Sequence, residues 1–147
     1  MPFPEVNHVT ESNRSDLSDK VIIVYDGECV FCSRSMAWIV DHDVHDRIRL
    51  TPCTSPLGSD LMREHGIDPD DPSTFLVIIE GRPFVRSRAM LELVPLLDVR
   101  AQPLRVFGLI PDPVRNVVYD WTARNRRRLV KGDCPVPSRE MTRRMIA

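Results

Sequence analysis

Long apolar runs are missing from this sequence of 147 residues. No stretch reaches the roughly 18 apolar residues that a membrane-spanning helix needs. Residues 1–20 are polar and hold four acidic side chains, where a signal peptide would need an apolar segment. We therefore expect a cytosolic protein that has no membrane as a partner.

Cysteine is also sparse, with four residues in the chain. In the reducing cytosol so few cysteines are not expected to form a structural disulfide framework. A hydrophobic content of 42% in a chain of this length is enough for a core without disulfide or metal staples. Two of the cysteines, Cys29 and Cys32, stand three residues apart. That spacing is more typical of a catalytic or metal-binding pair.

An excess of charge is absent overall, because the formal net charge is −1. The two ends differ, however: residues 1–99 hold 9 basic and 17 acidic residues, whereas residues 100–147 hold 11 and 4. An anion-binding surface would therefore lie in the last third. Near the arginine run 126–128 only Tyr119 and Trp121 could stack on bases. We expect a solvated helix face there and no nucleic acid partner.

The chain has the patterns of four strands and several helices. Residues 21–25 form a continuous β-branched and aromatic run, typical of a strand buried on both faces. Apolar residues at helical spacing follow Cys29. The other predicted strands are residues 47–51, 75–79 and 83–86, and further helices are predicted at residues 57–65 and from Ser87 to Pro95.

We divide the chain into a flexible tail at residues 1–20, a core at residues 21–110, and a C-terminal part at residues 111–147. The core order, βαβ followed by ββα, predicts an α/β thioredoxin-like fold with a mixed central sheet. Its βαβ half must be parallel and right-handed. Asp26, Cys53, residues 72–74 and residues 87–89 should then converge on the sheet edge that holds Cys29.

The C-terminal part is predicted to add a long amphipathic helix to this fold. Asp112 has the chemistry of an N-cap, and Pro113 suits the first helical position. An apolar stripe of Val114, Val117, Val118, Trp121 and Leu129 follows. We expect the helix to pack on the core through Val117, Val118 and Trp121, with the arginines in solvent and a tail after it.

Cys29 and Cys32 occupy the predicted junction between the first strand and the first helix. One helical turn brings residues three apart close enough for a reversible disulfide. Amides and the dipole at a helix start stabilise a thiolate, so Cys29 is the candidate nucleophile. Cys32, one turn inside and more shielded, is the candidate resolving thiol, which attacks a mixed disulfide at Cys29.

Asp26 stands three residues before Cys29 and has two possible roles. A buried carboxylate could accept the proton of Cys32 during resolution. Alternatively, it could cap the turn or the helix. If Asp26 and Glu28 are both ionised, they disfavour a thiolate at Cys29, which favours a reductase over a strong oxidant.

The segment Tyr25-Asp26-Gly27-Glu28-Cys29-Val30-Phe31-Cys32 resembles the motif of the DCC family of thiol-disulfide oxidoreductases. The resemblance extends to Ser87-Arg88-Ala89 and to Tyr119 with Ala123-Arg124-Asn125-Arg126, and covers about residues 21–137. It implies a thioredoxin-like fold and disulfide reductase activity, with Cys29 and Cys32 as the redox pair. Arg88 departs from the family pattern, which often has an acidic residue there. Thioredoxins have a proline immediately before the strand that corresponds to the one at Phe75. In this chain the nearest preceding proline is Pro72.

A substrate site is predicted at Ser87 and Arg88. Amides at the start of this helix, together with Arg88, could hold a substrate carboxylate beside Cys29. In the alternative, Ser87 is only an N-cap and Arg88 is solvated. The expected partners are a disulfide-bearing protein or small thiol substrate and an electron donor of unknown identity, with no cofactor.

Two other functions stay open. A zinc site could use Cys29, Cys32, Cys53 and Cys134, although structural zinc sites generally have two close cysteine pairs and the second pair is missing. The four histidines show no metal-binding spacing with the cysteines. Alternatively, the chain is a non-catalytic thioredoxin-like binding module, since a fold alone does not establish activity. A turnover assay separates an enzyme from a binding module.

Overall fold

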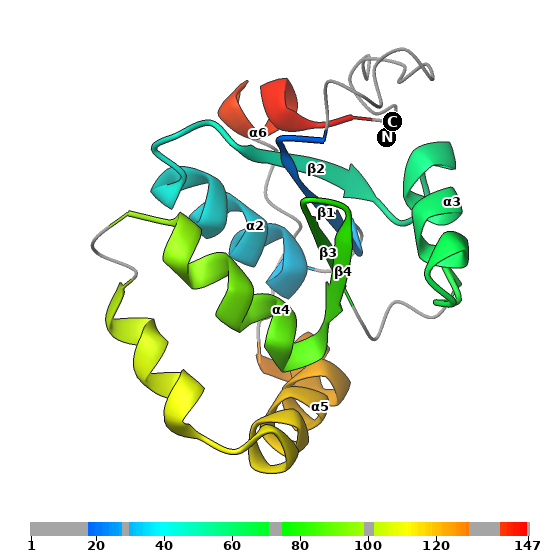
Figure 1. Ribbon diagram of the computed structural model, residues 1–147. Coiled ribbons are helices and arrows are strands. Elements are labelled where there is room, and N and C mark those ends of the chain that lie inside the picture. The colour runs from blue at the N-terminus through cyan, green and yellow to red at the C-terminus, as the bar shows by residue number, and fades with distance from the viewer. Residues whose placement is uncertain (1–17, 28–29, 71–74, 99–101, 130–138, 147) are drawn as a thin grey trace.

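The computed structural model describes residues 18–27, 30–70, 75–98, 102–129 and 139–146, without the side chains of residues 126, 127 and 129. Glu28, Cys29, Pro72 and Cys134 therefore lie outside the description. The elements (Figure 1) are β1 (Val21–Tyr25), α2 (Val30–His42), β2 (Ile48–Pro52), α3 (Pro56–Glu64), β3 (Leu76–Ile79), β4 (Arg82–Val85), α4 (Arg86–Leu93), η1 (Val94–Leu96), η2 (Gln102–Leu109), α5 (Asp112–Leu129) and α6 (Arg139–Arg144).

The four strands form one mixed sheet in the order β2-β1-β3-β4. β1 pairs parallel with β2 and antiparallel with β3, and β3 pairs antiparallel with β4. All five residues of β1 are buried, because this central strand has a neighbour on each side and helices over both faces of the sheet. The thioredoxin-like α/β fold predicted from the element order is confirmed.

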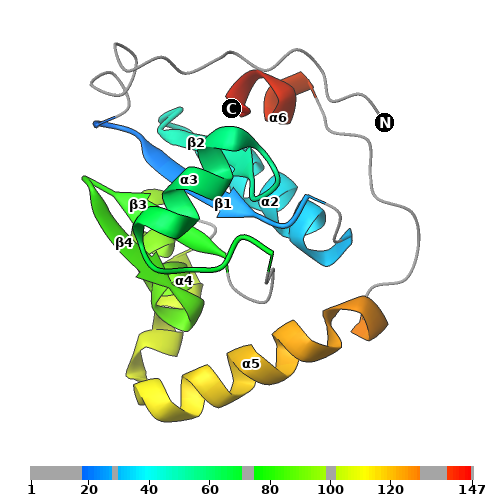
Figure 2. The same ribbon diagram turned by 90° about the vertical axis from the view of Figure 1, so that its right-hand side faces the viewer.

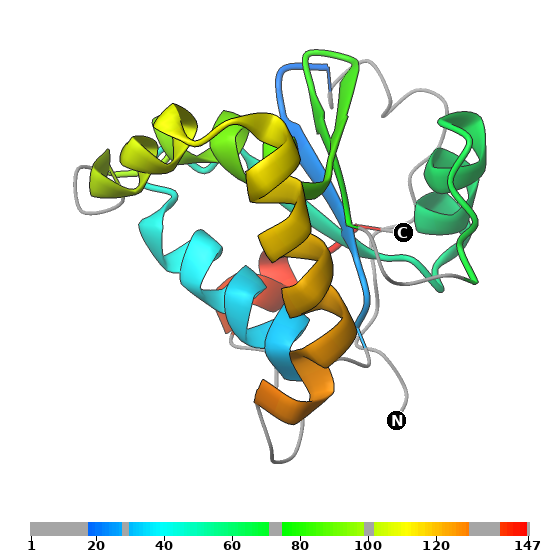
Figure 3. The same cartoon turned by 90° about the horizontal axis from the view of Figure 1, so that it is seen from below.

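Helices cover the two faces of the sheet unequally. In Figure 3, α2, α4 and α5 lie on one side of the strands and α3 on the other. Tyr25 and the alternate residues of β1 pack in the cluster that contains α2 and α4 side chains, whereas Ile22 and Val24 pack in the cluster that contains α3 side chains. Successive strand residues point to opposite faces. The run in β1 is therefore apolar throughout because both of its faces are covered.

Tight turns and caps define the ends of these elements. Glu80 and Gly81, which join β3 to β4, have φ angles of 50° and 76°, the pattern of a type I′ hairpin turn. Ser55 caps α3 by accepting a hydrogen bond from the Gly58 amide at 2.9 Å. The strands predicted at residues 75–79 and 83–86, which this turn joins, and the helix predicted at residues 57–65 are confirmed.

α5 lies along one side of the molecule, with its first half beside α4 (Figure 2). The prediction that it packs through Val117, Val118 and Trp121 was wrong. These side chains are 67%, 60% and 55% exposed. The helix meets α4 and α2 through its more polar face, which includes Asn116 and Tyr119. Side-chain hydrogen bonds to α4, and not the apolar stripe, fix the rotation of α5 about its axis.

The segment after α5, expected to be a tail, includes a further ordered helix, α6, at its end. Ile146 donates its amide hydrogen to the Leu50 carbonyl at 2.8 Å, and Met145 forms a parallel bridge with Leu50. Met141 and Met145 are buried in one core cluster and Ile146 in the other. The end of the chain therefore covers the outer edge of β2, which would otherwise present unpaired backbone groups.

Within the described residues, no helix is both long and apolar enough to cross a membrane.

Candidate redox site

The candidate site begins where β1 ends and α2 begins. Tyr25, the last residue of β1, pairs with Pro52, and its carbonyl accepts a hydrogen bond from the Cys53 amide at 2.8 Å. Asp26 is buried at 7% exposure, and Cys32 lies half-buried in the first turn of α2. The strand-to-helix junction predicted for the cysteine pair is thus present on both sides of residues 28 and 29.

A cavity of about 210 Å³ opens beside Cys32. Its walls come from the junction, α2, α4, α5 and the start of β3. The lining residues are Tyr25, Asp26, Phe31, Cys32, Ser35, Met36, Phe75, Met90, Tyr119, Thr122 and Ala123. Four of them are aromatic and two are methionines, while Asp26 is the only acidic one and none is basic. The described site is therefore an apolar cavity with a thiol and a carboxyl group in its wall.

Tyr25 connects the core to this cavity. Its side chain is 4% exposed. Burial raises the pKa of the Tyr25 phenol to about 12, and the nearby Cys32 adds to this, because a thiolate there would repel a phenolate. The phenol therefore stays protonated and neutral at any physiological pH. It cannot serve as a base toward the cysteine.

The second wall of the cavity is held in place by contacts between α4 and α5. Ser87 is buried and hydrogen-bonds to Asn116, and the Arg86 guanidinium forms an ion pair with both carboxylate oxygens of Asp120. Tyr119 packs against Phe75 with ring centroids 6.3 Å apart. These contacts place the Tyr119, Thr122 and Ala123 side of α5 against the cavity.

The structure brings some of the predicted residues together and separates others. Asp26 and Cys32 share the cavity wall, whereas Ser87 and Arg88 are not among its lining residues. Arg88 forms an ion pair with Glu92 at 2.9 Å, one turn along α4, and Ser87 bonds to α5. Cys29 lies outside the described residues, so its distance from Arg88 stays open. The carboxylate site at Arg88 stays a prediction.

Cys53 lies at the end of the sheet where the redox pair was predicted, but on the other face. It is buried in the core cluster beneath α3, whereas Cys32 packs against the cluster beneath α2. Cys29 and Cys134 lie outside the described residues, so the four-cysteine zinc site stays a prediction. Within the described residues, no three histidine, cysteine or acidic side chains are grouped to bind a metal ion.

Sequence reasoning missed most of the cavity wall. From the sequence, Phe75 is predicted only as the start of a strand and Met90 only as part of the helix from Ser87 to Pro95. Tyr119, Thr122 and Ala123 share one face of α5 at helical spacing. This face carries two small residues beside an aromatic one, a pattern that suits a helix lining a cavity. The neighbouring apolar stripe is the stronger periodic signal in this segment.

The mixed sheet, with Cys32 in the first turn of the helix that follows its buried central strand, places the chain in the class of thioredoxin-like proteins. The comparisons identify the family within that class. Residues 23–131 match the model of the DCC1-like thiol-disulfide oxidoreductases, and the chain belongs to this family.

Two curated proteins are similar to most of this chain. The chain is 27% identical to the uncharacterized protein YuxK of Bacillus subtilis, over 85% of this chain and 93% of that protein. It is 30% identical to a chloroplastic DCC family protein of Arabidopsis thaliana, over 82% of this chain and 72% of that protein. No solved structure gives a significant match.

Proposed function

We propose that this protein is a disulfide reductase that works through Cys29 and Cys32. The observation that carries the proposal is the position of Cys32 in the first turn of α2, directly after the buried central strand and in the wall of an open cavity. Family membership supports thiol-disulfide chemistry in general. The cavity gives a substrate room to approach this thiol.

The reaction transfers two electrons from the protein to the substrate. The Cys29 thiolate attacks one sulfur of a substrate disulfide, the S–S bond breaks, and the other sulfur leaves as a thiolate that takes up a proton. Cys32 then gives its proton to a base and attacks the Cys29 sulfur, which releases the second substrate thiol. The protein is left with a Cys29–Cys32 disulfide, and a dithiol donor must reduce it before the next cycle.

Asp26 is the proposed base in the second step. It is the only carboxylate among the residues that line the cavity, and it shares this wall with Cys32. Tyr25, which also lines the cavity, keeps its own proton. Positioned bases typically contribute a factor of roughly 10² to 10⁴ to proton transfer. A role for Asp26 in capping the junction is the alternative, and the substitution described in the Discussion separates the two.

Two cysteine variants test the proposed function. Cys29→Ser should abolish disulfide reduction, because it removes the nucleophile. Cys32→Ser should instead accumulate a mixed disulfide between Cys29 and the substrate, which intact mass spectrometry detects. If Cys32 alkylates faster than Cys29, the roles are reversed. If neither variant loses activity relative to the native chain, the protein is not a dithiol reductase.

The partners proposed for this reaction are a disulfide-bearing substrate and a dithiol electron donor. A reducing compartment such as the cytosol would keep the donor reduced and would favour the direction from protein to substrate. The measurement that decides direction is the reduction potential of the Cys29–Cys32 pair. A potential well above the cytosolic range would make the protein an oxidant instead.

A further inference from the structure

The wall of the cavity beside Cys32 differs from that of a site for charged substrates. Phe31, Phe75, Met36, Met90 and the two tyrosines supply most of its lining. Among the described lining residues, Asp26 has the only carboxyl group and no side chain is basic. A substrate carboxylate entering this cavity would leave water without gaining a cationic partner, which is unfavourable.

The two basic side chains of α4 are both paired. Arg86 is held by Asp120, and Arg88 by Glu92. Arg124, one residue beyond Ala123 on α5, is exposed and donates to the Asp120 carbonyl. None of these arginines is among the residues that line the cavity. The described site thus has no cation directed at the space beside Cys32.

The size of the cavity suits one ring or one large aliphatic group. Its volume is about 210 Å³, and a dry protein cavity of roughly 150 Å³ is enough to bind benzene. Aromatic and methionine side chains, which make up most of this wall, are adaptable partners for a ring. A single uncharged ring or aliphatic side chain would fill this cavity, whereas a charged side chain would not be stabilised there.

We propose that this cavity selects disulfides whose sulfur lies next to an uncharged aromatic or large aliphatic group, such as a cysteine beside phenylalanine in a peptide. This inference rests on the proposed reductase function, because it concerns which disulfide reaches the same cysteine pair. α5 makes the selection possible by closing one side of the cavity with Tyr119, Thr122 and Ala123. The helix added to the thioredoxin-like core is therefore the specificity element.

The test uses three disulfide-linked dimers of acetyl-Xaa-Cys-amide, in which Xaa is Phe, Ser or Glu. The full-length protein is first reduced and freed of reductant, and the rate of thiol release is measured in a single turnover. The Phe dimer should react roughly tenfold or more faster than the Ser dimer, since an apolar pocket discriminates by about this factor. The Glu dimer should be the slowest.

Two variants that fill the cavity locate the effect. Ala123→Leu fills it from α5, and Met90→Trp fills it from α4 at a residue that is 38% exposed and so tolerates a larger side chain. Both should bring the ratio of the Phe rate to the Ser rate toward one. Val117→Leu, on the outer face of α5, is the matched control and should retain the native ratio. Thermal unfolding identifies any variant that fails to fold, and the other variant then decides.

The outcomes distinguish the two proposals. Equal rates for all three dimers would overturn the apolar specificity and leave the reductase function standing. A preference for the Glu dimer would also overturn it and would favour an anion site such as the one predicted at Arg88. If no dimer releases thiol at all, the reductase function itself fails. A native ratio in both folded cavity variants would show that the selection takes place elsewhere.

Discussion

Tyr25 shows at the scale of a single residue how the fold sets chemistry. As the last residue of the central strand it is buried beside Cys32, and burial, followed by this thiol, raises the pKa of its phenol to about 12. In the unfolded chain the Tyr25 phenol would ionise near its ordinary pKa of about 10. Between these values only the unfolded state loses the proton, so the free energy of unfolding should fall as the pH rises from about 10 to 12.

A spectrophotometric titration near 295 nm tests this expectation. One of the two tyrosines should ionise close to pH 12 in the folded protein. Tyr25→Phe should remove that transition and flatten the loss of stability above pH 10. Cys32→Ala should lower the pKa only in part, because burial is the larger cause. A tyrosine that titrates near pH 10 in the folded state would contradict the buried environment of Tyr25.

Asp26 can be assigned by a substitution that keeps its shape. Asp26→Asn removes the base and retains much of the ability to cap the junction. If Asp26 accepts the proton of Cys32, the variant should resolve the mixed disulfide roughly 10²-fold more slowly at neutral pH. The deficit should shrink at higher pH, where Cys32 loses its proton without help. A capping role predicts unchanged resolution and a lower melting temperature in an Asp26→Ala variant.

At the scale of an element, α5 was predicted correctly in position and wrongly in orientation. Its start at Asp112 and its length follow from local signals. Which face meets the core depends on partners far away in the sequence, such as Ser87 for Asn116 and Arg86 for Asp120. Hydrophobic spacing reports an amphipathic helix but cannot show what lies against each face.

Two aromatic substitutions on α5 test this orientation. Tyr119→Ala should lower the free energy of unfolding by about 1 to 3 kcal/mol, because it removes the packing against Phe75. Trp121→Ala should change it by less than about 0.5 kcal/mol, because Trp121 is 55% exposed. Chemical denaturation of both variants measures the difference. A larger loss for Trp121→Ala would show that the apolar stripe is covered in solution.

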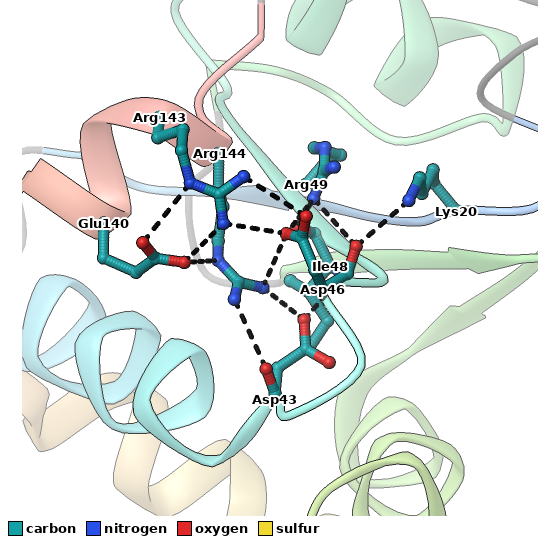
Figure 4. Close-up of polar contacts among 8 residues, drawn as sticks. All are labelled: Lys20, Asp43, Asp46, Ile48, Arg49, Glu140, Arg143 and Arg144. Carbon is teal, nitrogen blue, oxygen red and sulfur yellow. Dashed lines mark hydrogen bonds and ion pairs between the residues drawn. The ribbon is translucent and has the colours of Figure 1, made fainter.

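Across the whole molecule, an ion-pair cluster holds α6 against the edge of the sheet (Figure 4). Arg144 is 4% exposed and bonds to the Asp43 carboxylate, which also accepts the Ile48 amide. Arg143 bonds to Asp46 and Glu140 at the surface. The cluster joins α6 to the loop between α2 and β2, so residues about one hundred positions apart stabilise one edge of the sheet.

The two adjacent arginines should differ in importance. Arg144→Ala should cost about 3 kcal/mol or more of unfolding free energy, because it leaves the buried Asp43 carboxylate without its cation. Arg143→Ala should cost much less, because its ion pairs are half-exposed and screened by solvent. Denaturant titrations of the two variants make the comparison. Equal losses of unfolding free energy in the two variants would contradict a larger stabilising effect of the buried Arg144–Asp43 pair.

Acid should loosen the same cluster. Arg143, followed by Arg144, lowers the pKa of Glu140 to about 2, and Arg143 also holds the pKa of Asp46 below its ordinary value. Depressed carboxyl pKa values stabilise the fold above about pH 4 to 5, and this contribution is lost as the pH falls toward 2. Melting temperatures measured across this range should fall, and Glu140→Gln should make the fall less steep. High salt should weaken the effect.

Local sequence signals specify the parts of this protein that depend on neighbouring residues. The buried run of β1, the helix starts, the hairpin turn at Gly81 and the cysteine spacing all rest on short-range backbone and side-chain preferences. The order of these elements then restricted the fold to the thioredoxin-like arrangement, because crossover connections have one hand.

What those elements enclose depends instead on contacts between segments that are distant in the sequence. The rotation of α5, the separation of Cys53 from Cys32 on opposite faces, and the return of residues 139–146 to the edge of β2 all depend on contacts between distant segments. The cavity beside Cys32 is built from five parts of the chain. No short window of sequence specifies such a surface, because its walls are set by how the helices pack and not by their own propensities.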